Sequence, residues 1–165
     1  MNPLLKDIFS LAAQIVTRAN ERSLSIGTAE SCTGGLIGGA ITAISGSSAC
    51  FKGGITAYDN AVKHGLLSVP DQTIATHGAV SEQTAIAMAQ GALTALNVDI
   101  AVSVTGIAGP SGGSPQKPVG TVWIGIASAD SASATLFEFG NLGRNRVRDQ
   151  ACYEGLKMLD RRLNA

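Results

Sequence analysis

The apolar run V-D-I-A-V-S-V, residues 98–104, constrains the fold of this chain more than any other feature. Its β-branched side chains favour a strand, and a strand that is apolar along nearly its whole length is typical of a sheet covered on both faces. Helical patterns alternate with strand-like segments through most of the chain. The sequence therefore predicts a sheet flanked by helices.

The other elements follow from the periodicity of apolar residues and from turn residues. We expect helices over about 4–19, 36–44, 60–67, 82–96 and 144–163, strands near 25–29 and 54–58, and a hairpin formed by 119–127 and 134–139 around Asp130. The predicted fold class is α/β, with residues 1–165 forming a single three-layer domain. Its sheet is mixed and mostly parallel, flanked by helices, with a late antiparallel hairpin.

Composition narrows the class of protein. Of the 165 residues, 45% are hydrophobic and 15% are charged, which is typical of a chain that buries a core. Twelve basic residues balance twelve acidic ones, which argues against nucleic acid or an anionic membrane as a partner.

The N-terminus lacks the pattern of a signal peptide, and no run reaches the roughly 18 apolar residues of a membrane span. The three cysteines have no metal-binding spacing, so we expect reduced thiols, no metal and a cytoplasmic location.

The segment T-A-E-S-C-T-G-G-L-I-G-G, residues 28–39, lies where a strand is expected to end and a helix to begin. Ligands of open α/β sheets bind at strand ends, and the first turn of a helix offers N–H groups to an anion. Ser31 is therefore a candidate nucleophile with oxyanion donors close by. In the simpler alternative, Ser31 or Thr33 only caps the helix. Cys32 is a weaker rival nucleophile, because a helix N-terminus lowers a thiol pKa but no histidine is evidently placed to assist it.

A serine nucleophile needs a base, and this sequence offers a lysine rather than a suitable histidine. The segment Y-D-N-A-V-K, residues 58–63, follows the second expected strand. Lys63 can act as a base if burial or a cationic neighbour lowers its pKa, and Tyr58 can relay the proton or lower that pKa through a hydrogen bond. Alternatively, Tyr58 only ends a strand and Lys63 lies on a solvated helix face.

Two further segments are suited to an anionic substrate. The Gly- and Pro-rich loop 106–118 exposes N–H and hydroxyl groups that fit a phosphate or a ribose, although it has neither the Walker A order nor G-x-G-x-x-G. The segment R-N-R-V-R, residues 144–148, opens the closing helix. Its arginines oppose the helix dipole, so we expect a substrate phosphate or a subunit carboxylate as their partner. A flexible connection and a solvated basic face are the respective alternatives.

Together these motifs resemble the CinA C-terminal domain family, the nicotinamide-nucleotide amidohydrolases (PncC). The resemblance rests on A-E-S-C-T-G-G (29–35), G-S-S-A-C-F-K-G-G (46–54), Y-D-N-A-V-K (58–63), G-A-V-S (78–81), V-T-G-I-A-G-P-S-G-G (104–113) and K-P-V-G-T-V-W (117–123). It implies a compact α/β domain that hydrolyses the carboxamide of nicotinamide mononucleotide, giving nicotinic acid mononucleotide and ammonia. This reaction would salvage pyridine nucleotide, and it implies no metal and no cofactor.

The same resemblance assigns roles to residues. Ser31 matches the nucleophile, and Lys63 and Tyr58 match its activating partners. Backbone N–H groups near Cys32, Thr33 and Gly34 would bind the oxyanion. The residues expected to bind the substrate are Glu30, Thr105, Gly106, Gly112, Gly113, Ser114, Arg144 and Arg148. Before its arginines the chain reads N-L-G-R-N-R, where the family has an F-x-G-D-R-like approach.

The expected partners are a small nucleotide substrate and further copies of the chain in a homo-oligomer, and the resemblance suggests the stand-alone form of the family. Two other functions compete with the amidase. One is a catalytically silent nucleotide-binding or regulatory paralogue of this competence- and damage-inducible family. The other is direct DNA binding, which the zero net charge disfavours.

Overall fold

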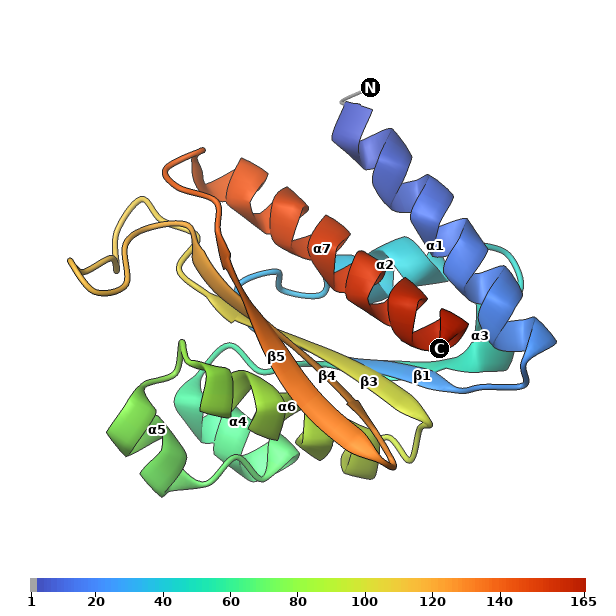
Figure 1. Ribbon diagram of the computed structural model, residues 1–165, viewed down its shortest axis with the longest axis horizontal. Helices are drawn as coiled ribbons and strands as arrows, with labels where there is room; N and C mark the ends of the chain where they lie inside the picture. The colour runs from blue at the N-terminus through green and yellow to red at the C-terminus, as the bar shows by residue number, and fades with distance from the viewer. Residues whose placement is uncertain (1–2) are drawn as a thin grey trace.

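Five strands form one twisted sheet in the order β2-β1-β3-β4-β5 in the computed structural model, which describes residues 3–165 (Figure 1). The strands are β1 (Ile26–Glu30), β2 (Phe51–Thr56), β3 (Ile100–Gly106), β4 (Thr121–Ser128) and β5 (Ser131–Glu138). β1 pairs in parallel with β2 and with β3, whereas β4 is antiparallel to both β3 and β5. Only β4 therefore runs against the other strands, and the expected mixed sheet with a late hairpin is confirmed.

Helices cover both faces of this sheet (Figure 1). On one face lie α1 (Pro3–Glu21), α2 (Leu36–Thr42), α3 (Ser47–Cys50) and α7 (Arg144–Asn164). On the other face lie α4 (Asn60–Leu67), α5 (Asp71–His77) and α6 (Glu82–Ala95). A cluster of buried apolar side chains fills the space between the sheet and each helical layer. The three-layer α/β architecture is therefore confirmed.

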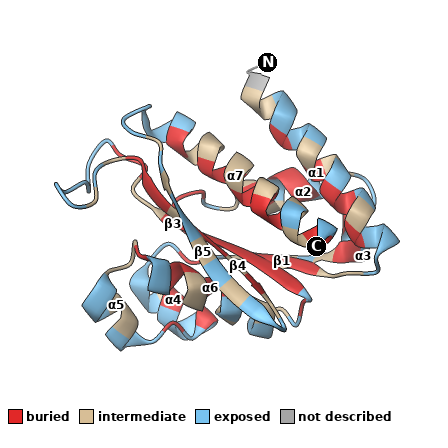
Figure 2. Ribbon diagram, in the orientation of Figure 1, coloured by how far each residue is buried: buried red, intermediate tan, exposed pale blue. Residues whose placement is uncertain are grey.

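Burial follows the position of each strand in the sheet (Figure 2). Every residue of β1 is buried, as is every residue of β3 except Gly106, because helices cover these central strands on both faces. β5 lies at an edge and alternates mostly between exposed and half-buried residues. The apolar run that dominates the sequence thus forms the centre of the fold, as a strand covered on both faces requires.

Several element boundaries differ from the sequence-based expectation. β2 spans Phe51–Thr56, so Tyr58 lies beyond the strand rather than at its end. β3 begins at Ile100 rather than Val98, because the Asp99 carboxylate instead accepts hydrogen bonds from the N–H and the hydroxyl of Ser25, at 2.7 and 2.6 Å. The helices α3 and α5 were not expected: α3 is a single turn within a Gly/Ser-rich stop, and α5 has no buried residue and hence no apolar stripe.

The carboxyl ends of β1, β2 and β3 lie at one edge of the sheet, because these three strands are parallel. The segments after them therefore meet, and the N-terminal end of α7 lies at this end of the molecule with the loop 106–118 (Figure 1). A main-chain hydrogen bond links the end of β1 to the segment after β2: the Ala57 N–H donates to the Glu30 carbonyl at 2.8 Å. None of the helices within residues 3–165 combines the length and the apolar character of a membrane span.

Candidate active site

Ser31 directly follows β1, and its backbone extends the pairing of β1 with β3. Its N–H donates to the Val104 carbonyl at 2.9 Å, and its own carbonyl accepts from the Gly34 N–H at 3.0 Å. Gly34 and Gly35 have φ angles of 64° and 100°, which glycine adopts without a steric penalty. They close a tight turn into α2, and this turn leaves Ser31 8% exposed.

Lys63 lies in α4, and its side chain extends to Ser31. Its Nζ is 3.3 Å from the Ser31 Oγ and 3.2 Å from the Tyr58 carbonyl oxygen. The residue is 1% exposed, so the alternative of a solvated helix face is wrong. Burial lowers the pKa of Lys63 below its ordinary value, against smaller raising effects from Asp59 and Cys32. A lysine of lowered pKa within hydrogen-bond reach of a serine meets the requirements of a general base.

Tyr58 contributes two polar groups with different partners. Its carbonyl accepts from the Lys63 Nζ, whereas its hydroxyl accepts from the Arg144 Nη2 at 2.9 Å. The residue is 61% exposed. In this structure the phenol therefore contacts Arg144 rather than Lys63 or Ser31. The proton relay expected of Tyr58 would require its side chain to turn, and that role stays a prediction.

The backbone of the turn supplies the candidate oxyanion donors. In the described part of the chain, the N–H groups of Cys32 and Thr33 donate to no other residue, although the Cys32 N–H also interacts with its own thiol. The Gly34 N–H, which was expected to join them, is already bonded to the Ser31 carbonyl. Cys32 and Thr33 thus remain as candidate donors, since an oxyanion hole needs N–H groups that have no other partner.

The carboxylate of Glu30 is not free, because both of its oxygen atoms accept hydrogen bonds from backbone N–H groups. Its Oε2 accepts from the N–H groups of Gly35 and Ile37 at 3.0 and 3.1 Å, and its Oε1 accepts from that of Gly38 at 2.9 Å. These N–H groups lie at the start of α2, where no carbonyl within the helix can reach them. In this structure the Glu30 carboxylate therefore caps α2, and its expected contact with the substrate stays a prediction. The same bonds occupy the N–H groups of Gly35, Ile37 and Gly38, which are therefore not free to bind an oxyanion.

Arg148, from the second turn of α7, also contacts the turn after β1. Its Nε donates to the Cys32 carbonyl at 3.0 Å, and its Nη2 donates to the Thr33 carbonyl at 2.9 Å. Arg144, one helical turn earlier, is exposed and donates to the Gly109 carbonyl at 2.9 Å as well as to Tyr58. The two arginines therefore meet different groups, although the sequence suggested one shared role in binding a phosphate.

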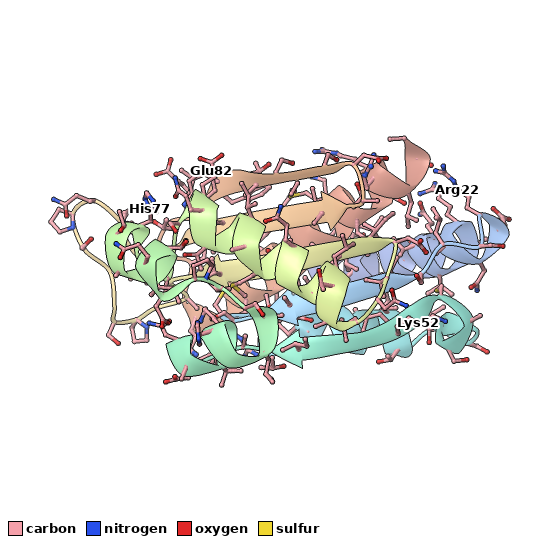
Figure 3. All side chains as sticks on the ribbon, turned by 90° about the horizontal axis from the view of Figure 1, so that it is seen from below. Arg22, Lys52, His77 and Glu82 are labelled. Carbon is pink, nitrogen blue, oxygen red and sulfur yellow. The ribbon has the colours of Figure 1, made fainter. Side chains whose placement is uncertain are left out.

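The loop 106–118 is held by bonds of its own. Ser114 and Lys117 are joined by two hydrogen bonds, of 2.9 and 3.1 Å. The Lys117 Nζ donates to the His77 carbonyl at 2.8 Å, which ties the loop to α5; Figure 3 labels His77. Gly112 and Gly113 are exposed near the tip of the loop. Their expected contacts with a substrate, and that of Ser114, stay predictions.

Thr105 and Gly106 are explained by contacts inside the chain. The Thr105 hydroxyl is buried and donates to the Ala79 carbonyl at 2.7 Å. Gly106 pairs with Val122, and a Cβ at this position would lie 2.6 Å from the Val122 Cγ2. The approach of β4 therefore accounts for this glycine without a ligand, and the substrate-binding roles of both residues stay predictions.

Cys32 is poorly suited to nucleophilic chemistry. Burial raises the pKa of its thiol to about 11, and nearby Glu30 also raises it, although its own backbone N–H and the side chains of Arg148 and Arg144 act in the opposite direction. The lowered thiol pKa that its place in the sequence suggested is therefore wrong. Within residues 3–165, no three His, Cys, Asp or Glu side chains gather in a way that could hold a metal ion.

Sequence reasoning missed Asp59, which positions Lys63. The Asp59 carboxylate accepts from the Ala61 N–H at 2.7 Å and so caps α4, the helix that carries Lys63. Its signal was available, because an Asp before a helix is a common N-cap. The capping by Glu30 and the contacts of Arg148 had no such local signal, since the Glu30 bonds depend on the tight turn and the partners of Arg148 are more than 100 positions away.

A buried lysine beside a serine, just beyond a central strand of an α/β sheet, defines a candidate site for covalent catalysis by a serine. The chain belongs to the family of the CinA C-terminal domain, whose model matches residues 8–163. It is 47% identical to the nicotinamide-nucleotide amidohydrolase PncC of Enterobacter agglomerans over 92% of this chain and 93% of that protein. The identity to PncC of Escherichia coli strain K12 is 44%, over 93% of each chain.

Other relatives extend the comparison. The crystal structure of the competence/damage inducible protein CihA from Agrobacterium tumefaciens superimposes with a TM-score of 0.93, at 44% identity over 96% of both chains. A CinA-like protein of Leptospira borgpetersenii is 50% identical over 87% of this chain. That match covers 34% of the Leptospira protein, so the chain spans about a third of the length of such relatives.

Proposed function

We propose that this chain is an amidohydrolase that cleaves the carboxamide of nicotinamide mononucleotide, giving nicotinic acid mononucleotide and ammonia. The observation that carries the proposal is the 3.3 Å contact between the Ser31 Oγ and the buried Lys63 Nζ. The relatives named nicotinamide-nucleotide amidohydrolase, which match this chain over nearly their whole length, indicate the substrate.

The first half of the reaction forms an acyl-enzyme. Neutral Lys63 takes the hydroxyl proton of Ser31 as the Oγ bonds to the carboxamide carbon. The carbonyl oxygen becomes an oxyanion, which the N–H groups of Cys32 and Thr33 bind. When the C–N bond breaks, protonated Lys63 gives its proton to the leaving nitrogen, which departs as ammonia. Ser31 is then esterified by the nicotinic acid group.

The second half uses the same groups with water as the nucleophile. Lys63 takes a proton from water as the water oxygen attacks the ester carbon, and the N–H groups of Cys32 and Thr33 again bind the oxyanion. Collapse of this intermediate releases nicotinic acid mononucleotide, and the Ser31 oxygen takes back a proton from Lys63. Tyr58 assists these transfers if its hydroxyl leaves Arg144 when the substrate binds.

The nucleotide phosphate is assigned to Arg144 with the loop 106–118. Arg144 is exposed, and its bonds to the Tyr58 hydroxyl and the Gly109 carbonyl use two of its five N–H donors. Exposed Gly112, Gly113 and Ser114 lie on the same loop as Gly109.

We further propose a cytoplasmic homo-oligomer, without nucleic acid as a partner. A mass measurement in solution tests the assembly, and a salt series of DNA affinity tests the last point.

Replacement of the nucleophile tests the proposed function. We expect Ser31→Ala to lower ammonia release from nicotinamide mononucleotide by at least about 10³-fold, because the substitution removes the oxygen on which the acyl-enzyme forms. Ser10→Ala, at an exposed position of α1, is the matched control and should keep full turnover. Undiminished turnover in Ser31→Ala contradicts the proposal. Nucleotide binding without ammonia release by the unaltered chain favours a silent regulatory protein instead.

A further inference from the structure

Two charged side chains fix the backbone of the turn between β1 and α2. Glu30 accepts from three N–H groups at the start of α2, and Arg148 donates to two consecutive carbonyls of the turn. Buried backbone groups need partners, and the Gly35 N–H and the carbonyls of Cys32 and Thr33 find them in these two side chains. Among residues 31–35, the N–H groups of Cys32 and Thr33 are the two that donate to no other residue in the described chain.

The contact of Arg148 is well suited to hold a backbone in one orientation. A guanidinium is planar and carries its donors in a rigid fork, so two bonds from one group fix the relative directions of the two carbonyls. Arg148 bonds to the carbonyls of Cys32 and Thr33 at 3.0 and 2.9 Å. A lysine has the same charge, but as a compact ammonium it lacks this fork.

The direction of one candidate oxyanion donor depends on this contact. The Cys32 carbonyl and the Thr33 N–H belong to the same peptide unit, which is planar, so fixing the carbonyl also fixes the N–H. A hydrogen bond to the carbonyl also polarises the N–H at the other end of the unit. The second bond, to the Thr33 carbonyl, fixes the next peptide unit, whose N–H closes the turn onto Ser31.

We propose that Arg148 is a positioning residue that holds the Thr33 N–H in place for the oxyanion, and that it does not bind the substrate phosphate. This inference rests on the proposed serine chemistry. Arg148 and Arg144, which are one helical turn apart, thus have different roles. Arg148 is half-buried against the turn of the nucleophile, whereas Arg144 is exposed and contacts Tyr58 and the loop.

The comparison of Arg148→Lys with Arg146→Lys tests the proposal. Arg146 is exposed in the same helix, so its replacement controls for the loss of a guanidinium from α7. We expect Arg148→Lys to lower kcat about 10²-fold, the effect of losing one oxyanion donor, and to change KM less than about threefold. The kcat loss should be equal for nicotinamide mononucleotide and for nicotinamide riboside, which has no phosphate.

The opposite pattern overturns the proposal. A rise in KM for the mononucleotide alone, with kcat unchanged, assigns Arg148 to the phosphate. Unchanged kinetics with both substrates show that the two carbonyl bonds do not matter for catalysis. As a second variant, Arg148→Ala should regain part of its activity when guanidinium ion is added, and failure of this rescue in a folded protein also counts against the positioning role.

Labelling with a covalent probe distinguishes a failure of the positioning role of Arg148 from a failure of the proposed amidase function. A fluorophosphonate that labels reactive serines requires the nucleophile and the oxyanion donors but no nicotinamide substrate. We expect the labelling rate of Ser31 to fall about 10²-fold in Arg148→Lys and to stay unchanged in Arg146→Lys. If the unaltered chain is labelled but releases no ammonia from the mononucleotide, the amidase proposal fails alone. If labelling is equally fast in all three proteins, the role of Arg148 fails.

Discussion

Lys63 is a buried amine that has no carboxylate in salt-bridge contact within residues 3–165, so its protonation is costly for the fold. In the part of the chain that the structure describes, its Nζ bonds only to two neutral oxygen atoms, those of the Ser31 hydroxyl and the Tyr58 carbonyl. Burial of a charge without a counter-ion shifts the equilibrium toward the neutral form and so lowers the pKa of Lys63. The property that would make Lys63 a base thus also lowers the stability of the protein when the amine is protonated.

The pH dependence of stability should reveal this cost. The pKa of Lys63 is below 10.5 in the folded state, so between the folded pKa and 10.5 the unfolded chain binds more protons. Over that window the stability contributed by this site rises with pH. We expect the stability of Lys63→Met relative to the unaltered protein to be greatest at neutral pH and to fall as the pH approaches 10.5. Denaturant unfolding of both proteins at several pH values measures this difference in the free energy of unfolding.

The control for this prediction is Lys6→Met, in which an exposed lysine of α1 loses the same charge. Its effect on the free energy of unfolding should vary less with pH than that of Lys63→Met. A difference between Lys63→Met and the unaltered protein that is constant from neutral pH to 10 would show that Lys63 has an ordinary pKa in the folded state, and it would remove the argument for this residue as a base.

At the scale of elements, the start of α2 depends on a single side chain from the preceding strand. Glu30 is 1% exposed, and its two oxygen atoms take three N–H bonds from the turn and the helix. α2 has seven residues and a glycine at its N-cap, with no side-chain cap of its own. Such a short helix is marginal without external support.

Removal of this carboxylate should therefore destabilise the protein. We expect Glu30→Ala to lower the free energy of unfolding by about 2–3 kcal/mol, because three N–H groups lose an ionised acceptor in a buried setting. Glu82→Ala removes an exposed glutamate from the first turn of α6 and should cost less than about 1 kcal/mol (Figure 3). Equal effects of the two substitutions in denaturant unfolding would mean that Glu30 contributes no more than a surface charge.

The sequence predicts those elements whose signal is local. Apolar stripes predicted α1 and α6, and the β-branched run predicted β3. α5 has no buried side chain, so no periodicity could indicate it. In the candidate site, Ser31 and Lys63 were found through the need of a serine for a base and through the family resemblance. The contacts of Arg148 join positions more than 100 residues apart, and no pattern in a single sequence reports such pairs.

At the scale of the whole molecule, the serine and the lysine come from different layers. Ser31 extends a central strand of the sheet, whereas Lys63 belongs to α4 in the helical layer on one face (Figure 1). The position of α4 depends on its close approach to α6. A Cβ at Gly91 of α6 would lie 2.0 Å from the carbonyl oxygen of Leu67, the last residue of α4. The distance between Ser31 and Lys63 therefore depends on how these two helices pack.

Gly91→Ala should push α4 away from α6 and so change stability and activity together. Its methyl group meets backbone, which cannot turn aside as a side chain can, so we expect a loss of about 1–3 kcal/mol and a lower kcat as Lys63 moves from Ser31. Gly65→Ala, in α4, has nothing within 4 Å of the added Cβ and should stabilise the protein by up to about 1 kcal/mol with kcat unchanged. Unfolding curves and ammonia release for both variants decide the matter. A Gly91→Ala protein with full stability and full turnover would show that α4 can shift without disturbing the Ser31–Lys63 contact.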